Sequence, residues 1–345
     1  MKKVIHFVYS DAFSGLESIA VRIIKNLPPD WEGYYAAPRG LGIECAEKAG
    51  VKTVPCNTHN VGEVKRIIRE ICPDAVHAHD PHMSFNLALT GVPFVSQLHC
   101  NCPWMNRISM NSIALAYSCM KASAVFCVSP SIEKEYVFRK IMRKKAHLLY
   151  NFVDPEQVQS GAGSVKDKKY DLCFTGRLTD IKQPEKFVEL VAEIKAEYSH
   201  ISAVVVGDGD AKERTQALAK KLSVAENITF VGFDPNPYRY MNESRIGVLT
   251  SANEGFGLVA VEAMILGLPF VAFPTGGLPD IINDENGKLC PDISDMKNEI
   301  MKLLSDPEYY RRKSEQAKLS SARFTDKDAY MKAVVSAYEN IRKAK

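Results

Sequence analysis

Short apolar runs alternate with longer stretches of helical spacing along the whole chain. In the first half, the alternation predicts strands near residues 4–9, 34–37, 75–78, 94–98, 124–128 and 148–150, and helices at 18–26 and 61–71. Strands that alternate with helices favour parallel sheets covered by helices. The first half is therefore predicted to be an α/β domain.

The stretch 153–169 is rich in Gly, Ser and Lys, which predicts a flexible linker. Beyond it, strands are expected at 171–175, 203–206, 228–231, 246–250 and 270–273, with a helix opened by Pro184. Residues 327–342 read as an amphipathic helix. A chain of 345 residues is long enough for two domains, which we place at residues 1–152 and 170–326.

The most informative stretch is Glu254-Gly-Phe-Gly-Leu-Val-Ala-Val-Glu262, which follows an apolar strand and leads into a helix. A glycine-containing loop before a helix presents backbone N–H groups and the positive helix end to an anion, most often phosphate. Glu254 is expected at the mouth of such a pocket. Glu262, two turns further on, is suited to bind hydroxyl groups. Phosphate and hydroxyl recognition together suggest a sugar nucleotide.

A second loop of interest is Thr175-Gly-Arg-Leu-Thr-Asp-Ile-Lys182. It follows a strand at the sheet edge where open α/β folds bind ligands, and Arg177 and Lys182 could hold phosphate oxygens. Two further loops, Gly207-Asp-Gly209 and Thr275-Gly-Gly-Leu-Pro-Asp280, follow strands of the same half. In the first half, Ser14 and Gly15 follow the first strand, and Gly15 permits a close backbone approach to a ligand.

The first half also contains the histidine- and cysteine-rich segments His77-Ala-His79-Asp-Pro-His82 and His99-Cys-Asn-Cys102. A metal site is one interpretation, because His77 and His79 share a strand face. Their spacing matches no standard zinc pattern, so we expect no metal site. His99, directly after a predicted strand, is either a substrate contact or a structural histidine.

Composition narrows the class of protein. The nine cysteines suit reduced, buried thiols in a cytoplasmic protein rather than a disulfide framework. No apolar run is long enough to span a membrane. The net charge is +3, and the basic excess lies in the first half, most densely at residues 139–145. That run is either a solvated helix face or a site for an anionic membrane surface. A nucleic-acid partner is not expected, because no recognised binding motif is present.

With these motifs the chain resembles a retaining glycosyltransferase of the GT-B fold, in family 4 (group 1). The likeness covers nearly the whole chain. It rests on Gly176-Arg-Leu-x-x-x-Lys182, Gly207-Asp-Gly209, Glu254-Gly-Phe-Gly-Leu-Val-Ala-Val-Glu262 and Gly276-Gly277, and less specifically on Ser14-Gly15 with Glu17, His77-x-His79, His99 and Asn151-Phe-Val-Asp154. Family members often have a glycine where this chain has Ser14.

The resemblance implies two Rossmann-like domains with parallel sheets facing a central cleft, the C-terminal helix (about 327–345) packing back on the first domain. It implies a nucleotide-diphospho-sugar donor, UDP-linked as is commonest in the family, and no metal cofactor. Arg177 and Lys182 would neutralise the departing diphosphate, Glu262 would bind the ribose, and Glu254 would hold the sugar, with His99 contacting it. The remaining donor-binding residues implied are Gly15, Gly207, Gly209, Gly255, Phe256, Gly257, Leu258 and Val259.

The acceptor implied by the resemblance is a carbohydrate or a lipid-linked glycan, as in cell-envelope or capsule polysaccharide synthesis. Acceptor contacts are expected around residues 10–17, 80–86 and 99–107, with Ser14, Asp80 and Asn101 as candidates. A location in the cytoplasm, at the inner face of the membrane through residues 139–145, would suit such an acceptor. Two alternatives remain: a nucleotide-sugar epimerase of the same fold, and a non-catalytic subunit that binds nucleotide sugars.

Overall fold

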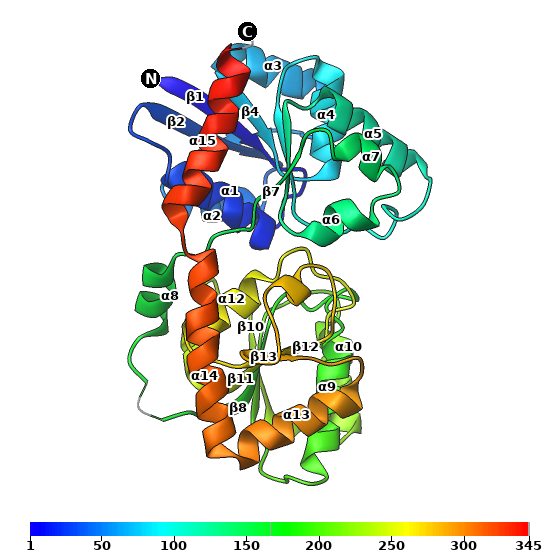
Figure 1. The fold of residues 1–345 in the computed structure, drawn as a ribbon, viewed down its shortest axis with the longest axis vertical. Coiled ribbons are helices and arrows are strands. Elements are labelled where there is room, and N and C mark those ends of the chain that lie inside the picture. The colour runs from blue at the N-terminus through cyan, green and yellow to red at the C-terminus, as the bar shows by residue number, and fades with distance from the viewer. Residues whose placement is uncertain (166, 344–345) are drawn as a thin grey trace. The chain divides into compact units, whose positions relative to one another are not determined.

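A computed structural model describes residues 1–165 and 167–343. The chain divides into two compact units, one formed by residues 1–151 with the C-terminal segment from Lys327, and the other by Phe152–Asp326. Each unit is built on a single parallel sheet with helices on its faces (Figure 1). The prediction of two Rossmann-like α/β domains is confirmed.

The N-terminal unit contains a seven-stranded sheet in the order β3-β2-β1-β4-β5-β6-β7. Its central strands are buried along their whole length, which explains why they read as continuous apolar runs. The strands are β1 (Lys2–Phe7), β2 (Trp31–Ala37), β3 (Lys52–Pro55), β4 (Ala75–Ala78), β5 (Val95–Leu98), β6 (Ala124–Cys127) and β7 (Ala146–Leu148).

Helices connect successive strands of this sheet, and most begin at a residue that can accept hydrogen bonds from the first turn. Asp80 caps α4 and Asn60 caps α3, for example. The C-terminal helix α15 packs against β4 and lies across the sheet (Figure 1). The helices are α1 (Gly15–Lys25), α2 (Leu41–Lys48), α3 (Val61–Ile71), α4 (Pro81–Thr90), α5 (Met110–Lys121), α6 (Pro130–Glu135), α7 (Arg139–Met142) and α15 (Lys327–Lys343).

The amphipathic stripe predicted for the last helix is confirmed. Tyr330, Val334, Ala337, Tyr338 and Ile341 are all buried on the face of α15 that packs on the N-terminal unit. The last two residues of the segment predicted to 345 lie outside the described residues.

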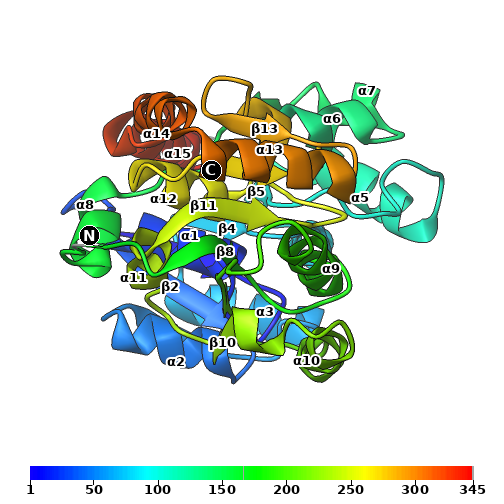
Figure 2. The same cartoon turned by 90° about the horizontal axis from the view of Figure 1, so that it is seen from below.

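The C-terminal unit contains a six-stranded parallel sheet in the order β10-β9-β8-β11-β12-β13. Its strands are β8 (Tyr170–Thr175), β9 (Ala203–Val206), β10 (Ile228–Gly232), β11 (Ser244–Leu249), β12 (Phe270–Ala272) and β13 (Gly287–Leu289). Helices α9, α10 and α13 cover one face, and α8, α11, α12 and α14 cover the other (Figure 2). These helices are α8 (Pro155–Ala162), α9 (Pro184–Lys195), α10 (Lys212–Lys221), α11 (Tyr238–Asn242), α12 (Leu258–Ile265), α13 (Ile293–Ser305) and α14 (Pro307–Ser321).

The interpretation of residues 153–169 as a flexible linker is wrong for most of the segment, of which Lys166 lies outside the described residues. Asp154 accepts hydrogen bonds from the backbone N–H groups of Glu156 and Gln157 (3.0 and 3.3 Å) and so caps α8. Pro155 at the first helical position favours the same start. The helix packs against α11 and α12, so the segment belongs to the C-terminal unit.

The sequence pattern also failed to indicate β3 and β13, two short strands at the outer edges of their sheets. Across the described residues, no helix combines the length and hydrophobicity needed to cross a membrane.

Candidate active site

The strand order of the C-terminal sheet reverses between β8 and β11. From β8 the chain continues to β9 and β10 on one side, and from β11 to β12 and β13 on the other. Helices α9 and α12, which follow these two strands, cover opposite faces, so the loops diverge at the carboxyl ends. Open α/β sheets bind ligands at this kind of switch point.

Lys182, from the loop after β8, forms an ion pair with Glu254, from the loop after β11. The pair therefore spans the switch point. The side chain of Glu254 is 7% exposed and that of Lys182 is 24% exposed. Ser251 donates its hydroxyl to the same carboxylate oxygen (2.8 Å). The two residues singled out from separate sequence motifs are thus brought together.

Backbone contacts hold these two loops side by side. The N–H of Ala252 donates to the carbonyl of Ile181 (2.8 Å), and the hydroxyl of Thr250 donates to the carbonyl of Gln183 (2.8 Å). The position of Lys182 relative to Glu254 is therefore fixed by the main chain as well as by the ion pair.

Glycines allow the remaining loops of this edge to pack against the first two. Gly276, with φ +55°, lies so close that a Cβ atom there would be 1.4 Å from the carbonyl oxygen of Glu254. A Cβ atom at Gly207 would be 1.9 Å from the carbonyl oxygen of Gly176, and one at Gly209 would be 2.4 Å from that of Leu178. Only glycine permits contacts this close. All four glycine-containing loops therefore meet at one edge of the sheet.

Helix α12 begins at this edge with Gly257 as its N-cap, in the left-handed region at φ +101°. No side chain caps the helix, and the first N–H groups of a helix have no acceptor within it. Leu258 and Val259 form its first turn, preceded by half-buried Gly255 and buried Phe256. This end of α12 is suited to an anion.

The two other charged candidates differ in their surroundings. Glu262, 7% exposed, lies on α12 and accepts a hydrogen bond from the hydroxyl of Tyr238 (3.3 Å). Arg177 is exposed and forms no ion pair with any described residue. Its guanidinium group is therefore free to bind an anion, whereas Lys182 already has a counter-ion.

In the N-terminal unit the strand order reverses between β1 and β4. The loop after β1 is closed by a capping box, in which the N–H and hydroxyl of Ser14 donate to Glu17 (2.8 and 2.5 Å). Gly15 is the first residue of α1. Asp80, after β4, accepts from the N–H groups of Tyr9 and Met83 (3.0 and 2.7 Å). Burial raises the pKa of Asp80 to about 6.

The polar groups of the three acceptor-side candidates are thus engaged in local structure. Asn101 follows the same pattern, because its amide donates to Glu135 (2.6 Å) and its oxygen accepts from Ser131 (3.5 Å). Contacts of Ser14, Asp80 and Asn101 with an acceptor stay a prediction.

Four buried histidines pack ring against ring, and we call them the histidine cluster: His6, His77, His79 and His99. Two of them, His6 and His77, contact Tyr338 of α15. His6 on β1 pairs in register with His77 on β4, and His79 lies two residues further along the same face. His6 Nδ1 is 2.8 Å from His79 Nε2, and His79 Nδ1 is 3.2 Å from His99 Nε2. Burial lowers the pKa of His6 and of His99 to about 3, and those of the other two well below the ordinary value.

The geometry of the histidine cluster favours hydrogen bonding over metal binding. Ring nitrogens of His6, His77 and His79 lie within 4.8 Å of one another. The rings of His77 and His79 are stacked, however, with centroids 4.3 Å apart and planes inclined by 29°. Imidazole lone pairs lie in the ring plane, so those of stacked rings lie in separate, nearly parallel planes, which disfavours their convergence on one ion. His82 lies apart from this group and stacks on Tyr9 (5.1 Å).

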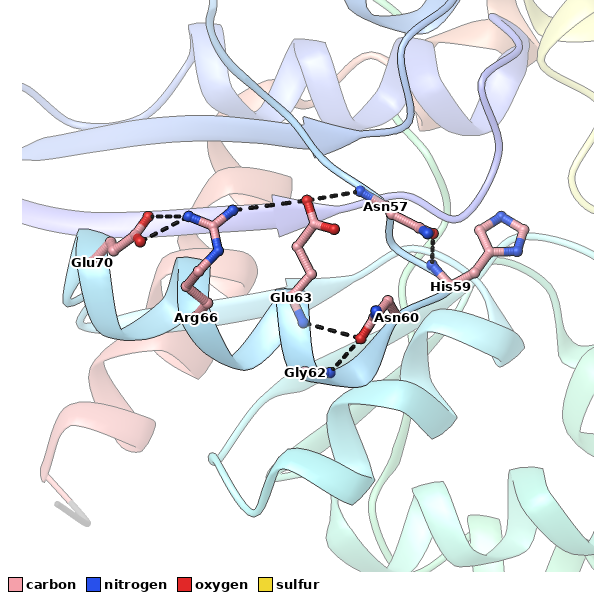
Figure 3. Close-up of polar contacts among 7 residues, drawn as sticks. All are labelled: Asn57, His59, Asn60, Gly62, Glu63, Arg66 and Glu70. Carbon is pink, nitrogen blue, oxygen red and sulfur yellow. Dashed lines mark hydrogen bonds and ion pairs between the residues drawn. The ribbon is translucent and has the colours of Figure 1, made fainter.

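A hollow of about 590 Å³ lies beside the carboxyl ends of β2 and β3, lined in part by Arg39, His59 and Glu63. Figure 3 shows the start of α3, which contributes Glu63 to the lining of the hollow. The side chain of Asn60 caps the helix, and Glu63 accepts from the backbone N–H of Asn57 (3.2 Å). His59 stacks on Tyr9 (4.0 Å), which continues the stack to His82. His59 therefore links the lining of the hollow to this stack of rings.

Comparison with known proteins identifies two adjoining family matches. Residues 28–157 match the profile "Glycosyltransferase Family 4", and residues 156–320 match "Glycosyl transferases group 1". The solved structure of HepE from Anabaena, in complex with UDP and glucose, superposes with a TM-score of 0.86 at 18% identity, covering 98% of this chain and 100% of that one. Sucrose-phosphate synthase from Thermosynechococcus elongatus superposes with a TM-score of 0.80 at 16% identity, covering 100% of both chains.

The chain belongs to the group 1 glycosyltransferases with the GT-B fold. Among curated relatives, N-acetyl-alpha-D-glucosaminyl L-malate synthase of Bacillus anthracis is 27% identical over 244 residues, 68% of this chain and 62% of that protein. The O-antigen biosynthesis glycosyltransferase WbnH of Escherichia coli is 29% identical over 234 residues, 68% of this chain and 63% of that one. The matched regions thus span less than two thirds of these relatives.

Three residues of this glycosyltransferase chain escaped the sequence interpretation. Ser251, which bonds to Glu254, lies three residues before it in an otherwise unremarked strand end. His6 and Tyr338 join the histidine cluster from opposite ends of the chain. Strand alternation could have indicated His6, since it stands within the first predicted strand, but nothing in the sequence linked Tyr338 to it.

Proposed function

We propose that the protein transfers a hexose from a nucleotide-diphospho-sugar, UDP-linked, to a carbohydrate or lipid-linked acceptor with retention of anomeric configuration. The observation that carries the proposal is the Lys182–Glu254 pair at the switch point between β8 and β11. Around it lie the glycine loops and the uncapped start of α12. Cations, N–H groups and carboxylates at one sheet edge match the phosphates and hydroxyls of such a donor.

The proposed mechanism follows from the charges that develop on the donor as its sugar–phosphate bond breaks. Cleavage of the sugar–phosphate bond leaves negative charge on the diphosphate and builds positive charge on the sugar. Arg177 and Lys182, with the N-terminus of α12, would stabilise the leaving diphosphate more strongly in the transition state than in the ground state. These fixed charges do the work that a divalent ion does in other transferases, so we expect activity without a metal cofactor.

The remaining donor contacts are assigned by chemistry. Glu254 and the N–H groups of Phe256, Gly257 and Leu258 would hold the sugar and phosphates, with Val259 in the same turn. Glu262 would accept from ribose hydroxyls and Gly207, Gly209 and Gly255 would permit close approach of backbone to the nucleotide. UDP and UDP-glucose in the HepE complexes support this class of donor. Retention fits same-face attack, in which the leaving phosphate takes the acceptor's proton.

The N-terminal unit would supply the acceptor contacts. We assign His99 to the transferred sugar and the loop containing Ser14 and Gly15 to the neighbourhood of the donor. The stacked rings of His59, Tyr9 and His82 offer flat apolar faces, which suit the C–H faces of a pyranose, beside the hollow. An acceptor glycan would lie along this edge, with Asp80 and Asn101 shaping it.

Attachment to an anionic membrane surface is the second part of the proposal. Within the basic run 139–145, Arg143 pairs with Glu133 and Lys145 donates to carbonyl oxygens at the end of α5. Arg139, Lys140 and Lys144 remain exposed. Helix α5, which packs on α7, exposes Met110, Ile113 and Met120. Apolar side chains beside free cations are typical of surfaces that rest on lipid. One relative is named for a diphospho-undecaprenol substrate, which supports a lipid-linked acceptor.

A thermal-shift panel of nucleotides and nucleotide sugars tests the donor assignment, because a ligand that binds the folded protein raises its melting temperature by mass action. We expect UDP and a UDP-hexose to stabilise the wild type and to act less on Arg177→Ala. No stabilisation by any nucleotide sugar would refute the proposal.

Product analysis separates the alternatives. Incubation of the stabilising donor without acceptor should leave the sugar unchanged, whereas an epimerase would invert a ring carbon. Addition of a glycan or lipid-linked glycan should release UDP, whereas a non-catalytic subunit would release none. EDTA should leave transfer intact; loss restored by a divalent ion would contradict the metal-independent mechanism.

A further inference from the structure

The buried histidines of the N-terminal unit form a continuous hydrogen-bonded chain that ends at His99. The hydroxyl of Tyr338 lies 3.4 Å from His6 Nε2, and His6 Nδ1 lies 2.8 Å from His79 Nε2. His79 Nδ1 in turn lies 3.2 Å from His99 Nε2. A side branch joins His77 Nδ1 to the same hydroxyl at 2.8 Å. The chain runs from α15 to the carboxyl end of β5.

Neutral imidazoles make such a chain directional. A neutral histidine has one N–H donor and one bare nitrogen acceptor, so a proton position chosen at one ring sets the next. All four rings are 9% exposed or less, and burial holds their pKa values far below the ordinary value. Burial also raises the pKa of the Tyr338 hydroxyl, which keeps its proton. Two arrangements satisfy every link and also use the hydroxyl proton of Tyr338, and they run in opposite directions.

The two ends of the chain decide between these directions. His77 Nε2 and His99 Nδ1 are buried nitrogens without a hydrogen-bond partner among the described residues. In one direction His77 Nε2 is a bare acceptor and His99 Nδ1 carries a proton. In the other, His77 Nε2–H is an unpaired donor at a residue with no exposed surface. Each direction leaves one N–H donor without a partner, at His99 in the first and at His77 in the second. His99 is 9% exposed, so a ligand could reach its ring, whereas His77 has no exposed surface. Because orphaned buried N–H groups are rare in proteins, the first direction is favoured.

We propose that Tyr338, His6 and His79 are positioning residues that hold His99 as its Nδ1–H tautomer, so that His99 offers one uncharged N–H donor to a ligand oxygen. In the favoured direction Tyr338 donates to His6, His6 donates to His79, and His79 donates to His99 Nε2. The identity of the ligand rests on the proposed function, which makes that oxygen a hydroxyl of the transferred sugar.

An uncharged donor suits that site for a physical reason. Positive charge grows on the sugar as its bond to phosphate breaks, and an imidazolium ion beside it would oppose this change. A neutral N–H can orient the sugar hydroxyl without that repulsion. The hydrogen-bonded chain of buried rings thus keeps His99 uncharged and sets the direction of its hydrogen bond to the ligand.

Nitrogen-15 NMR of the imidazole rings tests the proposal on the full chain, because protonated and bare ring nitrogens have well-separated shifts. The His99 signals are assigned by their loss in His99→Gln. In the wild type we expect a proton on His99 Nδ1 and a bare Nε2. In His79→Leu, which removes the donor to Nε2, the Nδ1–H population should fall about two- to tenfold, the range of one buried hydrogen bond.

Two variants serve as matched controls. His79→Asn keeps an N–H near the position of Nδ1 and should retain the wild-type tautomer of His99. Tyr330→Phe removes a buried hydroxyl of the same helix, which accepts from Gln97 (3.0 Å) outside the chain, and should leave the His99 signals unchanged. A proton on His99 Nε2 in the wild type overturns the proposal even if His79→Leu fails to fold. An unchanged tautomer in folded His79→Leu overturns it too.

The functional consequence is measured separately. His79→Leu should lower kcat about two- to tenfold with an unchanged KM for the nucleotide sugar, and His79→Asn should restore most of that loss. Equal kcat values for the wild type and His79→Leu contradict a positioning role. Failure to bind any nucleotide sugar would remove the proposed function while leaving the tautomer result intact, so the two failures are distinguishable.

Discussion

Replacement of Lys182 by alanine separates the catalytic role of this residue from its structural role. The change leaves the carboxylate of Glu254, 7% exposed, with the hydroxyl of Ser251 as its remaining side-chain partner. A hydrogen bond to a charged group is worth about 1.5–3 kcal/mol. Because a domain of this kind has about 5–15 kcal/mol of stability, the variant should fold, with a melting temperature lowered by about 3–12 °C.

The effect on transfer should be larger. If Lys182 stabilises the leaving diphosphate, its loss should lower kcat about 100- to 1000-fold, the range found when one fixed donor to a developing anion is removed. Turnover is measured by UDP release at a temperature where both proteins are folded, and melting is followed by circular dichroism. Lys186→Ala is a matched control, because this half-buried lysine of the neighbouring helix α9 lies over the Phe273 ring and has no role in the proposed site.

The double variant Lys182→Ala/Glu254→Gln distinguishes the two roles. Removal of the uncompensated carboxylate should recover part of the lost stability, while turnover stays low because the cation is still missing. Recovery of turnover together with stability would mean that Lys182 acts only on the fold. Turnover of Lys182→Ala within about threefold of wild type would likewise refute the assigned role.

Three further predictions follow from the same geometry. Arg177→Ala should change stability by less than about 0.5 kcal/mol, because the side chain is exposed and unpaired, but it should weaken UDP binding measured by calorimetry. Replacement of the exposed Arg311 of α14 by alanine should not weaken UDP binding, and equal affinities of the two variants would refute the role of Arg177. Gly276→Ala should destabilise the C-terminal unit by more than about 3 kcal/mol in denaturant melts, because its Cβ would overlap the Glu254 carbonyl. The control Gly163→Ala, at φ +63° with nothing within 4 Å of the added Cβ, should cost only about 1–3 kcal/mol of backbone strain. Equal losses of stability in the two variants would contradict the loop packing. The histidine cluster has depressed pKa values, so the stability that it contributes is present above about pH 6.5 and is lost as the pH falls toward 3. The raised pKa of Asp80, about 6, acts in the opposite direction by about one proton, so unfolding at pH 5.5 should take up about three protons net. The change of unfolding free energy with pH, from denaturant melts between pH 5 and 6, reports this uptake, and a value below one proton would contradict the neutral cluster. His200→Gln, at an exposed histidine, serves as the control.

The overall fold was predictable because its signals are local. Each unit of a strand followed by a helix is indicated by the pattern of about twenty consecutive residues, and parallel pairing follows from the alternation of strands with helices. The sequence pattern was misleading where an element was short, or where one segment combined residues typical of a helix start with residues typical of a linker. The three residues of β13, Gly287–Leu289, include no apolar run. Asp154 and Pro155 indicate the start of a helix, but the glycines and lysines that follow them suggested a linker.

The candidate site was predictable only as far as sheet topology could be inferred. Lys182 and Glu254 stand 72 positions apart, and their meeting depends on β8 and β11 being neighbours, which the motifs alone do not state. His6 and Tyr338 stand 332 positions apart. Their contact depends on α15 returning to the N-terminal sheet and on the strand register that aligns His6 with His77. Side-chain relations of this kind arise from tertiary packing, which periodicity does not encode.

The pairing of Lys182 with Glu254 reconciles two demands on a diphosphate site. A partly buried lysine without a counter-ion would raise the cost of folding, and an unopposed cation would hold the product as firmly as the transition state. Glu254 satisfies Lys182 when no ligand is bound, while Arg177 stays exposed for the first contact. A donor must then compete with Glu254 for Lys182, so part of the attraction is realised only as charge builds on the leaving group. Weaker ground-state binding with undiminished transition-state binding is the condition for a high kcat, and it also eases the departure of UDP.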